Sequence, residues 1–311
     1  MKKIVGEAAL DLIKNENIQN KTINFLEMLF PYIGIEKKAV DTYIEEIEKS
    51  NLPIDVKIPL LLNAKKNLKK MKNQEAIAEI AKNNIREGTN LSKESGVSEE
   101  WLDRFMESAS FVSLEQMQLV WGKILANEFE NPGCIPSNMI RILSEFTPLY
   151  ASVFKKLCSM RVLLISINDD NNSVMKINWR NVIAFSENEE YMKKIGISFE
   201  ILNELETLGV IKFNPLTGYA DTDIKENKVL VYLNGRVLET SAYSKGRFPI
   251  GNVIFTSAGE ALRKITDLCT VKGYEETVIK YIREQGIKLE ESQCKISIME
   301  NKIEVFKEGE R

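Results

Sequence analysis

Histidine is absent from all 311 residues of this sequence. Its absence excludes imidazole general bases, Ser–His and Cys–His nucleophile pairs, and metal sites with histidine ligands. Other catalytic groups remain, so the absence lowers the expectation of catalysis without removing it. We therefore expect a chain without a catalytic residue, a cofactor or a metal, and an enzymatic activity stays an open alternative.

Cysteine is scarce and scattered. Only Cys134, Cys158, Cys269 and Cys294 are present, and no two of them form a C-x-x-C pair. This spacing argues against a structural zinc site. Four separated thiols are typical of proteins from a reducing compartment, so we expect a cytoplasmic protein.

Neither a strong net charge nor a long apolar run is present. The formal net charge is −3, so the chain lacks the basic excess of most nucleic-acid-binding proteins. The most apolar stretch, residues 23–35, is interrupted by Glu27 and Pro31 and is too short to span a bilayer. The phosphate-binding patterns G-x-x-x-x-G-K-[ST] and G-x-G-x-x-G are also absent.

The residues that are present predict a mainly α chain, α+β overall, in three parts. Apolar residues at helical spacing predict a helical domain over residues 1–146. A winged-helix-like α+β domain is expected over residues 147–271. The rest, residues 272–311, should form an extension with a helix over 275–283 and a β-hairpin over 295–306.

The clearest helix lies between Val112 and Gly133. Ser113 and Gln116 are spaced as a capping box, which predicts its first turn. Asn131-Pro132-Gly133 predicts its end, because proline disfavours helix in the residue before it. Apolar residues recur between these ends at helical spacing: Met117, Val120, Trp121, Ile124, Leu125 and Phe129.

Three residues of this helix call for separate interpretations. Trp121 is expected to anchor the core, and Gly122 beside it would let another helix approach closely. Glu128 follows the apolar stripe on the same face, where burial could raise its pKa and make it a general base. We favour the ordinary interpretation, in which Glu128 pairs with Arg141 or caps the helix that starts near Ser137.

After residue 148 the pattern changes to helix, helix, strand, long hairpin and closing helix, an order that resembles a winged helix. Ser198 and Gly209 delimit one of these helices. Asn234-Gly235 predicts the hairpin. A second capping box, Ser257 and Glu260, predicts the start of the closing helix.

Candidate contacts to nucleic acid or phosphate come from two basic stretches. They are Lys65, Lys66, Lys69, Lys70 and Lys72 on one predicted helix, and Lys245 and Arg247 near the hairpin. The ordinary explanation of such a helix is a solvated face, since lysine lacks the planar fork of arginine. Residues 199–208 carry three glutamates and no Lys or Arg, so like charges would meet DNA phosphates there. We therefore expect the winged-helix-like domain to pack against protein, with a DNA-binding regulator as the alternative.

A metal-dependent nuclease is a second alternative. Such an enzyme needs clustered carboxylates that bind the metal. Glu304 with Lys307, or Asp221 with Asp223, could supply them. Surface carboxylates are common, so this indication is weak.

The segment from Val97 to Pro148 resembles a bacterial family, the domain of unknown function 2806. The core of the family motif comprises Gln116, Trp121, Leu125, Glu128, Pro132 and Gly133. The resemblance extends over most of residues 70–270. The same core is similar to the abortive-infection alpha group of phage-defence proteins, which implies a role in the conflict between phage and host but no activity for a single residue.

These observations lead to one expectation and two alternatives. We expect a non-enzymatic protein–protein interaction protein in bacterial anti-phage defence or in phage–host conflict. Its partners should be proteins, including further copies of itself in a homo-oligomer. The DNA-binding regulator and the nuclease effector remain the alternatives.

Overall fold

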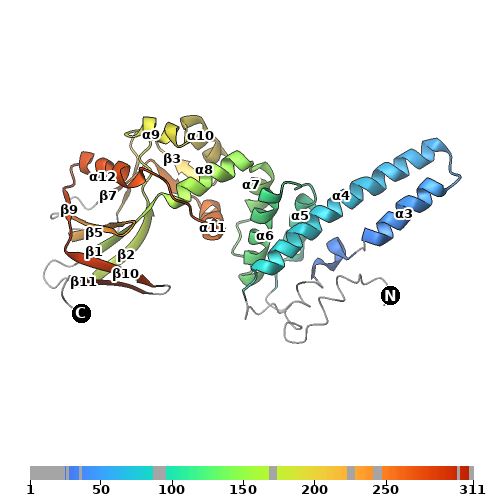
Figure 1. Ribbon diagram of the computed structural model, residues 1–311, viewed down its shortest axis with the longest axis horizontal. Helices are drawn as coiled ribbons and strands as arrows, with labels where there is room; N and C mark the ends of the chain where they lie inside the picture. The colour runs from blue at the N-terminus through green and yellow to red at the C-terminus, as the bar shows by residue number, and fades with distance from the viewer. Residues whose placement is uncertain are drawn as a thin grey trace. The chain divides into compact units, whose positions relative to one another are not determined.

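The computed structural model describes residues 25, 28–34, 37–86, 96–167, 174–222, 228–240, 247–299 and 302–307. The chain divides into two compact units, Met1–Pro148 (unit 1) and Leu149–Arg311 (unit 2). Helices make up unit 1, and unit 2 combines helices with antiparallel strands (Figure 1), which confirms the expected α+β composition. Among the helices of these ranges, none combines the length and apolar character needed to cross a bilayer.

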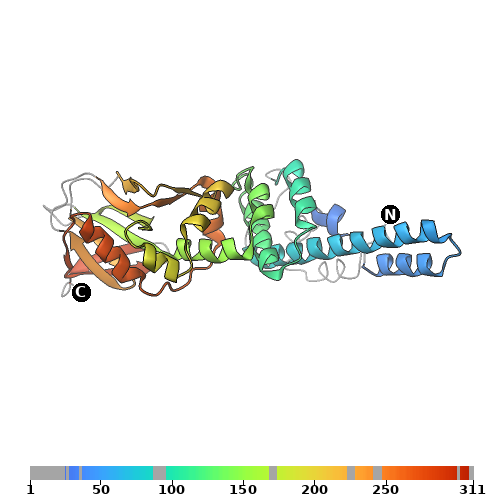
Figure 2. The same ribbon diagram turned by 90° about the horizontal axis from the view of Figure 1, so that it is seen from above.

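Unit 1 is organised around one long helix, α4, and shorter helices lie beside each of its halves. In Figures 1 and 2, α3 runs beside the N-terminal half of α4, and α5 to α7 gather at its C-terminal half. The helices are α3 (Lys37–Lys49), α4 (Ile54–Asn84), α5 (Glu99–Ala109), α6 (Glu115–Glu130) and α7 (Met139–Glu145).

Helices α6 and α4 approach each other closely at Gly122, as the sequence predicted. A Cβ atom at this position would lie only 2.4 Å from Cγ2 of Ile80 and 3.2 Å from the backbone nitrogen of Ala81. Glycine is therefore required for the two helices to pack this closely. Trp121, the preceding residue, is 1% exposed and its ring lies 4.9 Å from that of Phe105, which confirms it as a core anchor.

The capping box predicted at the start of α6 is wrong. The helix begins at Glu115, its N-cap residue is Leu114, and no side chain caps it. Gln116 is exposed. The side chain of Gln118 instead donates from Nε2 to the carbonyl oxygen of Val112, at 2.9 Å. The backbone is still extended at Leu114, so the helix starts too late for the predicted box.

Unit 2 is built around a five-stranded antiparallel sheet of order β2-β1-β5-β6-β9, and β10–β11, β3–β8 and β4–β7 form separate two-stranded pairs. Its helices are α8 (Pro148–Ser159), α9 (Glu189–Lys194), α10 (Phe199–Leu208), α11 (Ser257–Ile265) and α12 (Tyr274–Glu284). Its strands are β1 (Arg161–Ile167), β2 (Val174–Asn181), β3 (Ile211–Phe213), β4 (Tyr219–Asp221), β5 (Lys228–Leu233), β6 (Arg236–Thr240), β7 (Phe248–Gly251), β8 (Val253–Phe255), β9 (Leu289–Glu291), β10 (Cys294–Met299) and β11 (Lys302–Lys307).

The predicted hairpin forms the centre of this sheet. Asn234 and Gly235 have positive φ angles of 47° and 94°, as a type I′ turn requires. The hairpin strand β5 pairs with β1, whereas β3, the strand after α10, pairs with β8. Buried residues of the sheet, including Leu163 and Leu230, are covered by side chains of β10 and β11 such as Ile296.

Two helix starts in unit 2 test the capping predictions. Ser198 caps α10 as expected, accepting a hydrogen bond from the backbone N–H of Ile201. The box predicted at Ser257 is displaced by one residue, because Thr256 is the N-cap and accepts from the N–H of Gly259. The hydroxyl of Thr256 also donates to the carbonyl oxygen of Gly209, at 2.6 Å, which fixes Thr256 at that position.

Replacing Gly122 with alanine should lower the free energy of unfolding by about 1–3 kcal/mol, because the added methyl group overlaps Ile80. The change is measured by urea denaturation. Leu119→Ala, on the exposed side of α6, is the matched control and should stay within about 0.5 kcal/mol of the wild type. Equal stability of the wild type and Gly122→Ala would contradict the close approach.

Candidate functional site

Glu128, in the last turn of α6, holds the loop that follows the helix. It is 3% exposed. Its carboxylate oxygens accept hydrogen bonds from the backbone N–H groups of Gly133, at 2.6 Å, and Ile135, at 3.0 Å. Burial raises the pKa of the Glu128 carboxyl, and the two backbone hydrogen bonds oppose that rise. Both carboxylate oxygens thus accept hydrogen bonds from backbone N–H groups. This arrangement gives Glu128 a structural role, because it holds the loop.

The capping role expected for Glu128 is wrong, because α7 begins at Met139 and no side chain caps it. The turn at Gly133, with a φ of 80°, brings the loop N–H groups back to the end of α6, ahead of the first turn of α7. Arg141 lies 3.2 Å from Glu145, one turn along α7, and its pairing with Glu128 stays a prediction. The carboxylate thus holds the α6–α7 loop and caps no helix.

The other family-motif residues lie along α6 and its exit loop. Trp121 and Leu125 are buried on the core side. Gln116 is exposed in the first turn, and Pro132 and Gly133 are exposed in the loop. The motif therefore describes one helix with its core contacts and its end.

A groove of about 520 Å³ opens beside the start of α6, between the end of α5 and α7. Phe111 and Leu114 stand at its rim, with exposed fractions of 68% and 56%, whereas Trp121 and Leu143 are buried. Its lining residues are Glu107, Ser108, Phe111, Val112, Ser113, Leu114, Met117, Trp121, Leu143, Ser144 and Phe146.

Two side-chain amides from α4 hold the α5 side of this groove. Nδ2 of Asn73 donates to the carbonyl oxygen of Ser110, and Nε2 of Gln74 donates to that of Met106, both at 2.8 Å. These bonds tie the end of α5 to α4, and the Met106 carbonyl also accepts from the backbone N–H of Ser110, at 3.0 Å. With Gln118 holding Val112, the turn that carries Phe111 is fixed from both sides.

One lysine of the basic run reaches the groove. Nζ of Lys70 lies 4.7 Å from the centre of the Phe111 ring, a cation–π contact. Lys65 instead lies 3.7 Å from Glu48 of α3. The remaining lysines of the run, Lys66, Lys69 and Lys72, are exposed along α4. The structure thus does not bring the run together at one point.

The other predicted contact and metal residues lie in unit 2 or outside the described ranges. Arg247 is exposed just before β7, and Lys245 lies outside the described residues, as does Asp223. Asp221 is buried and lies 2.5 Å from Nε of Arg180, so its charge is already compensated.

The terminal hairpin places Glu304 and Lys307 on β11, with Glu304 opposite Ser297 of β10. Across the ranges that the structure describes, no group of three or more His, Cys, Asp or Glu side chains is placed to hold a metal ion.

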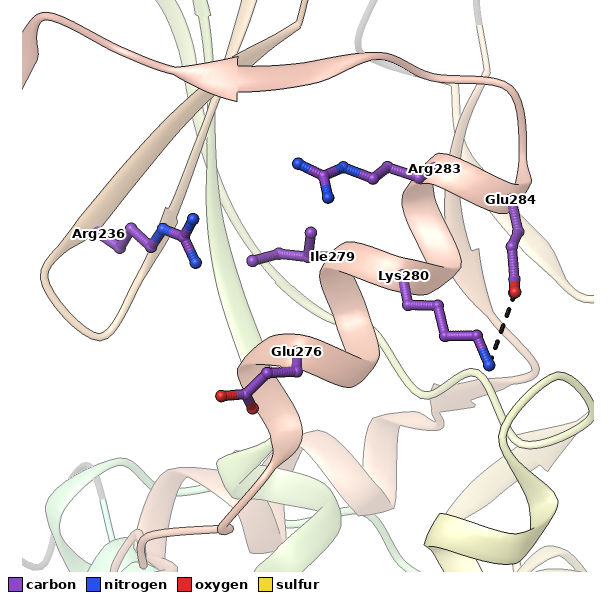
Figure 3. A pocket seen from close by; sticks show the side chains of 6 residues that line it. All are labelled: Arg236, Glu276, Ile279, Lys280, Arg283 and Glu284. Atoms are coloured by element: carbon purple, nitrogen blue, oxygen red, sulfur yellow. Dashed lines mark ion pairs between the residues drawn. The ribbon is translucent and has the colours of Figure 1, made fainter.

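Unit 2 has a pocket of its own, of about 490 Å³, between α12 and the start of β6. Figure 3 shows the guanidinium groups of Arg236 and Arg283 directed toward it on either side of Ile279. Two such groups beside an apolar side chain would suit an anionic ligand with an apolar part.

The charges around this pocket are largely compensated. Arg236 lies 3.3 Å from Glu275 and also pairs with Glu291. Lys280 lies 3.7 Å from Glu284, the pair marked by a dashed line in Figure 3. An anion would have to compete with these carboxylates, so the groove beside α6 is the stronger candidate.

Sequence reasoning did not find the groove. The capping-box interpretation placed Ser113 at the helix start, whereas Ser113 lines the groove. The sequence does contain one indication of the groove, the apolar residues Phe111 and Leu114 on either side of a turn. Apolar side chains exposed in a turn do not contribute to the core.

Replacing Glu128 tests the loop contact through its pH dependence. The folded state holds the proton of a carboxyl with a raised pKa more tightly than the unfolded state does. Its contribution to stability is therefore complete below the ordinary value of 4.5 and is lost as the pH rises to the folded-state pKa. Glu128→Gln should lie within about 1 kcal/mol of the wild type at acidic pH, and its relative stability should then rise with pH.

Denaturation of both proteins across a pH series measures this difference. Glu128→Ala should cost about 1–3 kcal/mol at acidic pH, since the buried N–H of Ile135 loses its acceptor, and this cost should shrink as the pH rises. Parallel profiles for the wild type and Glu128→Gln would contradict the raised pKa.

With this geometry established, a comparison with protein families gives one match. The family model described as "Protein of unknown function (DUF2806)" matches residues 62–279, well over half of the chain, and includes α6 and the groove. The chain belongs to this family. Neither curated proteins nor solved structures provide a match.

Proposed function

We propose that this member of the DUF2806 family acts by binding another protein and not by catalysing a reaction. The observation that carries the proposal is the groove beside α6, where Phe111 and Leu114 are more than half exposed above the buried Trp121. Large apolar side chains exposed around a concave apolar surface are typical of interaction sites.

The partner that fits the groove is a protein segment with an apolar side chain next to a lysine or arginine. The apolar side chain would displace water from Phe111 and Leu114, which is favourable in proportion to the area buried. The cation would meet Glu107, an exposed residue of the groove wall.

The groove also requires little reorganisation before a partner binds. The amides of Asn73, Gln74 and Gln118 already hold the turn that presents Phe111. A surface fixed in its bound conformation loses less entropy on association than a mobile one. This favours a binding role for the turn.

We place this binding in bacterial anti-phage defence or phage–host conflict. Support comes from the resemblance of the α6 core, from Gln116 to Glu128, to the abortive-infection alpha group. This is an argument from similarity and assigns no chemistry to a residue.

We further propose that α9, α10, β3, β8 and α11 form a winged-helix-like arrangement used for packing against protein. Its support is the order of elements: α10 leads through Gly209 to β3, β3 pairs with β8, and β8 leads to α11. The charges of α10, with Glu200, Glu204 and Glu206 and no Lys or Arg, disfavour placement in a DNA groove.

Leu114→Asp should abolish partner binding, because it places a charge among the apolar residues of the groove. We expect proteins enriched from phage-infected bacterial cells with the wild-type chain to be lost with Leu114→Asp. Leu119→Asp is the matched control, since Leu119 lies in α6 close to its N-cap residue Leu114, is 43% exposed and does not line the groove. Quantitative mass spectrometry of the enriched proteins measures the outcome.

Identical protein sets from Leu114→Asp and the wild type would contradict the proposal. Duplex-DNA binding that weakens steeply with added salt would favour the regulator alternative instead.

A further inference from the structure

The N-terminal half of α4 presents a row of apolar side chains to water. Ile54, Ile58 and Leu62 are 74%, 50% and 56% exposed. At about 100° per residue they fall within about 80° of the helix circumference. The buried Ala64 lies on another side of the helix, whereas Lys65 lies in the same sector and reaches Glu48 of α3, at 3.7 Å. We call Ile54, Ile58 and Leu62 the α4 row.

The same face of α4 changes from apolar to basic along its length. Lys65, Lys69 and Lys72 continue the sector of the α4 row by the same helical geometry. At the opposite end of the row the first turn of α4 carries the acidic Asp55. One face of the helix thus runs from acidic through apolar to basic.

We propose that the α4 row binds the α4 row of a second copy of this chain, with the two helices antiparallel. In that arrangement Ile58 of each copy faces Leu62 of the other, which forms a self-complementary two-fold interface. The proposal concerns a different surface from the groove beside α6 and does not depend on its partner.

Charge selects the antiparallel direction. With Ile58 opposite Leu62 of the second copy, Asp55 of each chain lies opposite Lys65 of the other. A parallel pair would instead place Lys65 and Lys69 against the same lysines of the second copy, where like charges repel. The acidic-to-basic order along α4 therefore fits one orientation of one occupant, the chain itself.

The antiparallel register also fits the space around α4. The paired segment, residues 54–66, ends before Asn73, where α4 becomes buried in the core of unit 1. The tip of the second copy's α3–α4 hairpin would therefore stop short of α5 and α6. A segment of this size spans about 18 Å of helix.

Sedimentation velocity of the full chain over a concentration series tests the proposal. We expect a dimer for the wild type, and Ile58→Glu should raise the dissociation constant roughly 100-fold, because two unpaired carboxylates would be buried in the interface. Val56→Glu is the matched control. Val56 is on the same helix and 44% exposed, but it lies away from the row, so this variant should remain a dimer.

Charge exchange tests the direction of pairing. Asp55→Lys or Lys65→Asp alone should weaken the dimer roughly threefold, and the double variant should recover the wild-type constant. Circular dichroism checks that every variant keeps its helical content. Leu114→Asp should leave the dimer unchanged, so failure of this inference and failure of the groove proposal are distinguishable.

Three results would overturn the inference. A wild-type chain that stays monomeric has no such interface. The same holds if the monomeric chain binds vesicles of anionic phospholipid. Dissociation by both Ile58→Glu and Val56→Glu would move the interface away from the row. A dimer that Ile58→Glu leaves intact would exclude the row from it.

Discussion

The close approach of α6 to α4 at Gly122 is the contact on which unit 1 depends. With no Cβ between them, Ile80 and the backbone of α4 pack directly on α6, and Trp121 enters the core beside them. Interiors this closely packed leave little room for rearrangement. The contact therefore fixes where α6 begins and ends relative to α4, and with it the turn before α6 and the loop after it.

Both ends of α6 are then held by polar side chains, each satisfying backbone groups that a helix end or a turn leaves unpaired. Glu128 accepts from the exit loop, and Gln118 donates to the entry turn. The result is a rigid surface in which Phe111 and Leu114 remain in water. Burying these two side chains would stabilise the folded chain further. Their fixed, exposed positions are therefore better explained by binding of a partner than by stability.

The two halves of α4 have different roles. Its C-terminal half, from Asn73, supplies core contacts and the amides that fix the groove. Its N-terminal half packs on α3 along one side and leaves the α4 row exposed. One continuous helix thus connects a surface suited to a partner protein with a surface suited to a second copy.

Local signals in the sequence predicted most elements, and tertiary contacts account for what was missed. The interior of α6, the Ser198 cap and the turn at Asn234 follow from periodicity or from one residue's preference. The displaced helix starts depend on competing partners, as when Thr256 reaches Gly209. Strand β2 was missed, because its sequence VMKINWRN does not alternate cleanly and its Arg180 pairs with the distant Asp221.

The groove could not be predicted for the same reason. Asn73 reaches Ser110 across 37 residues of sequence, and no local pattern reports such a contact. The α4 row was available in the sequence as Ile54, Ile58 and Leu62. Its exposure became evident only once α3 was seen to cover a different side of the helix.

Hydrogen–deuterium exchange of the wild-type chain at two concentrations tests most directly the claim that unit 1 works through its exposed apolar faces. We predict that protection of the α4 segment over residues 54–66 increases at the higher concentration, while α12 and the sheet of unit 2 exchange at unchanged rates. Exchange that is independent of concentration throughout α4, or protection that increases only in unit 2, would contradict the account.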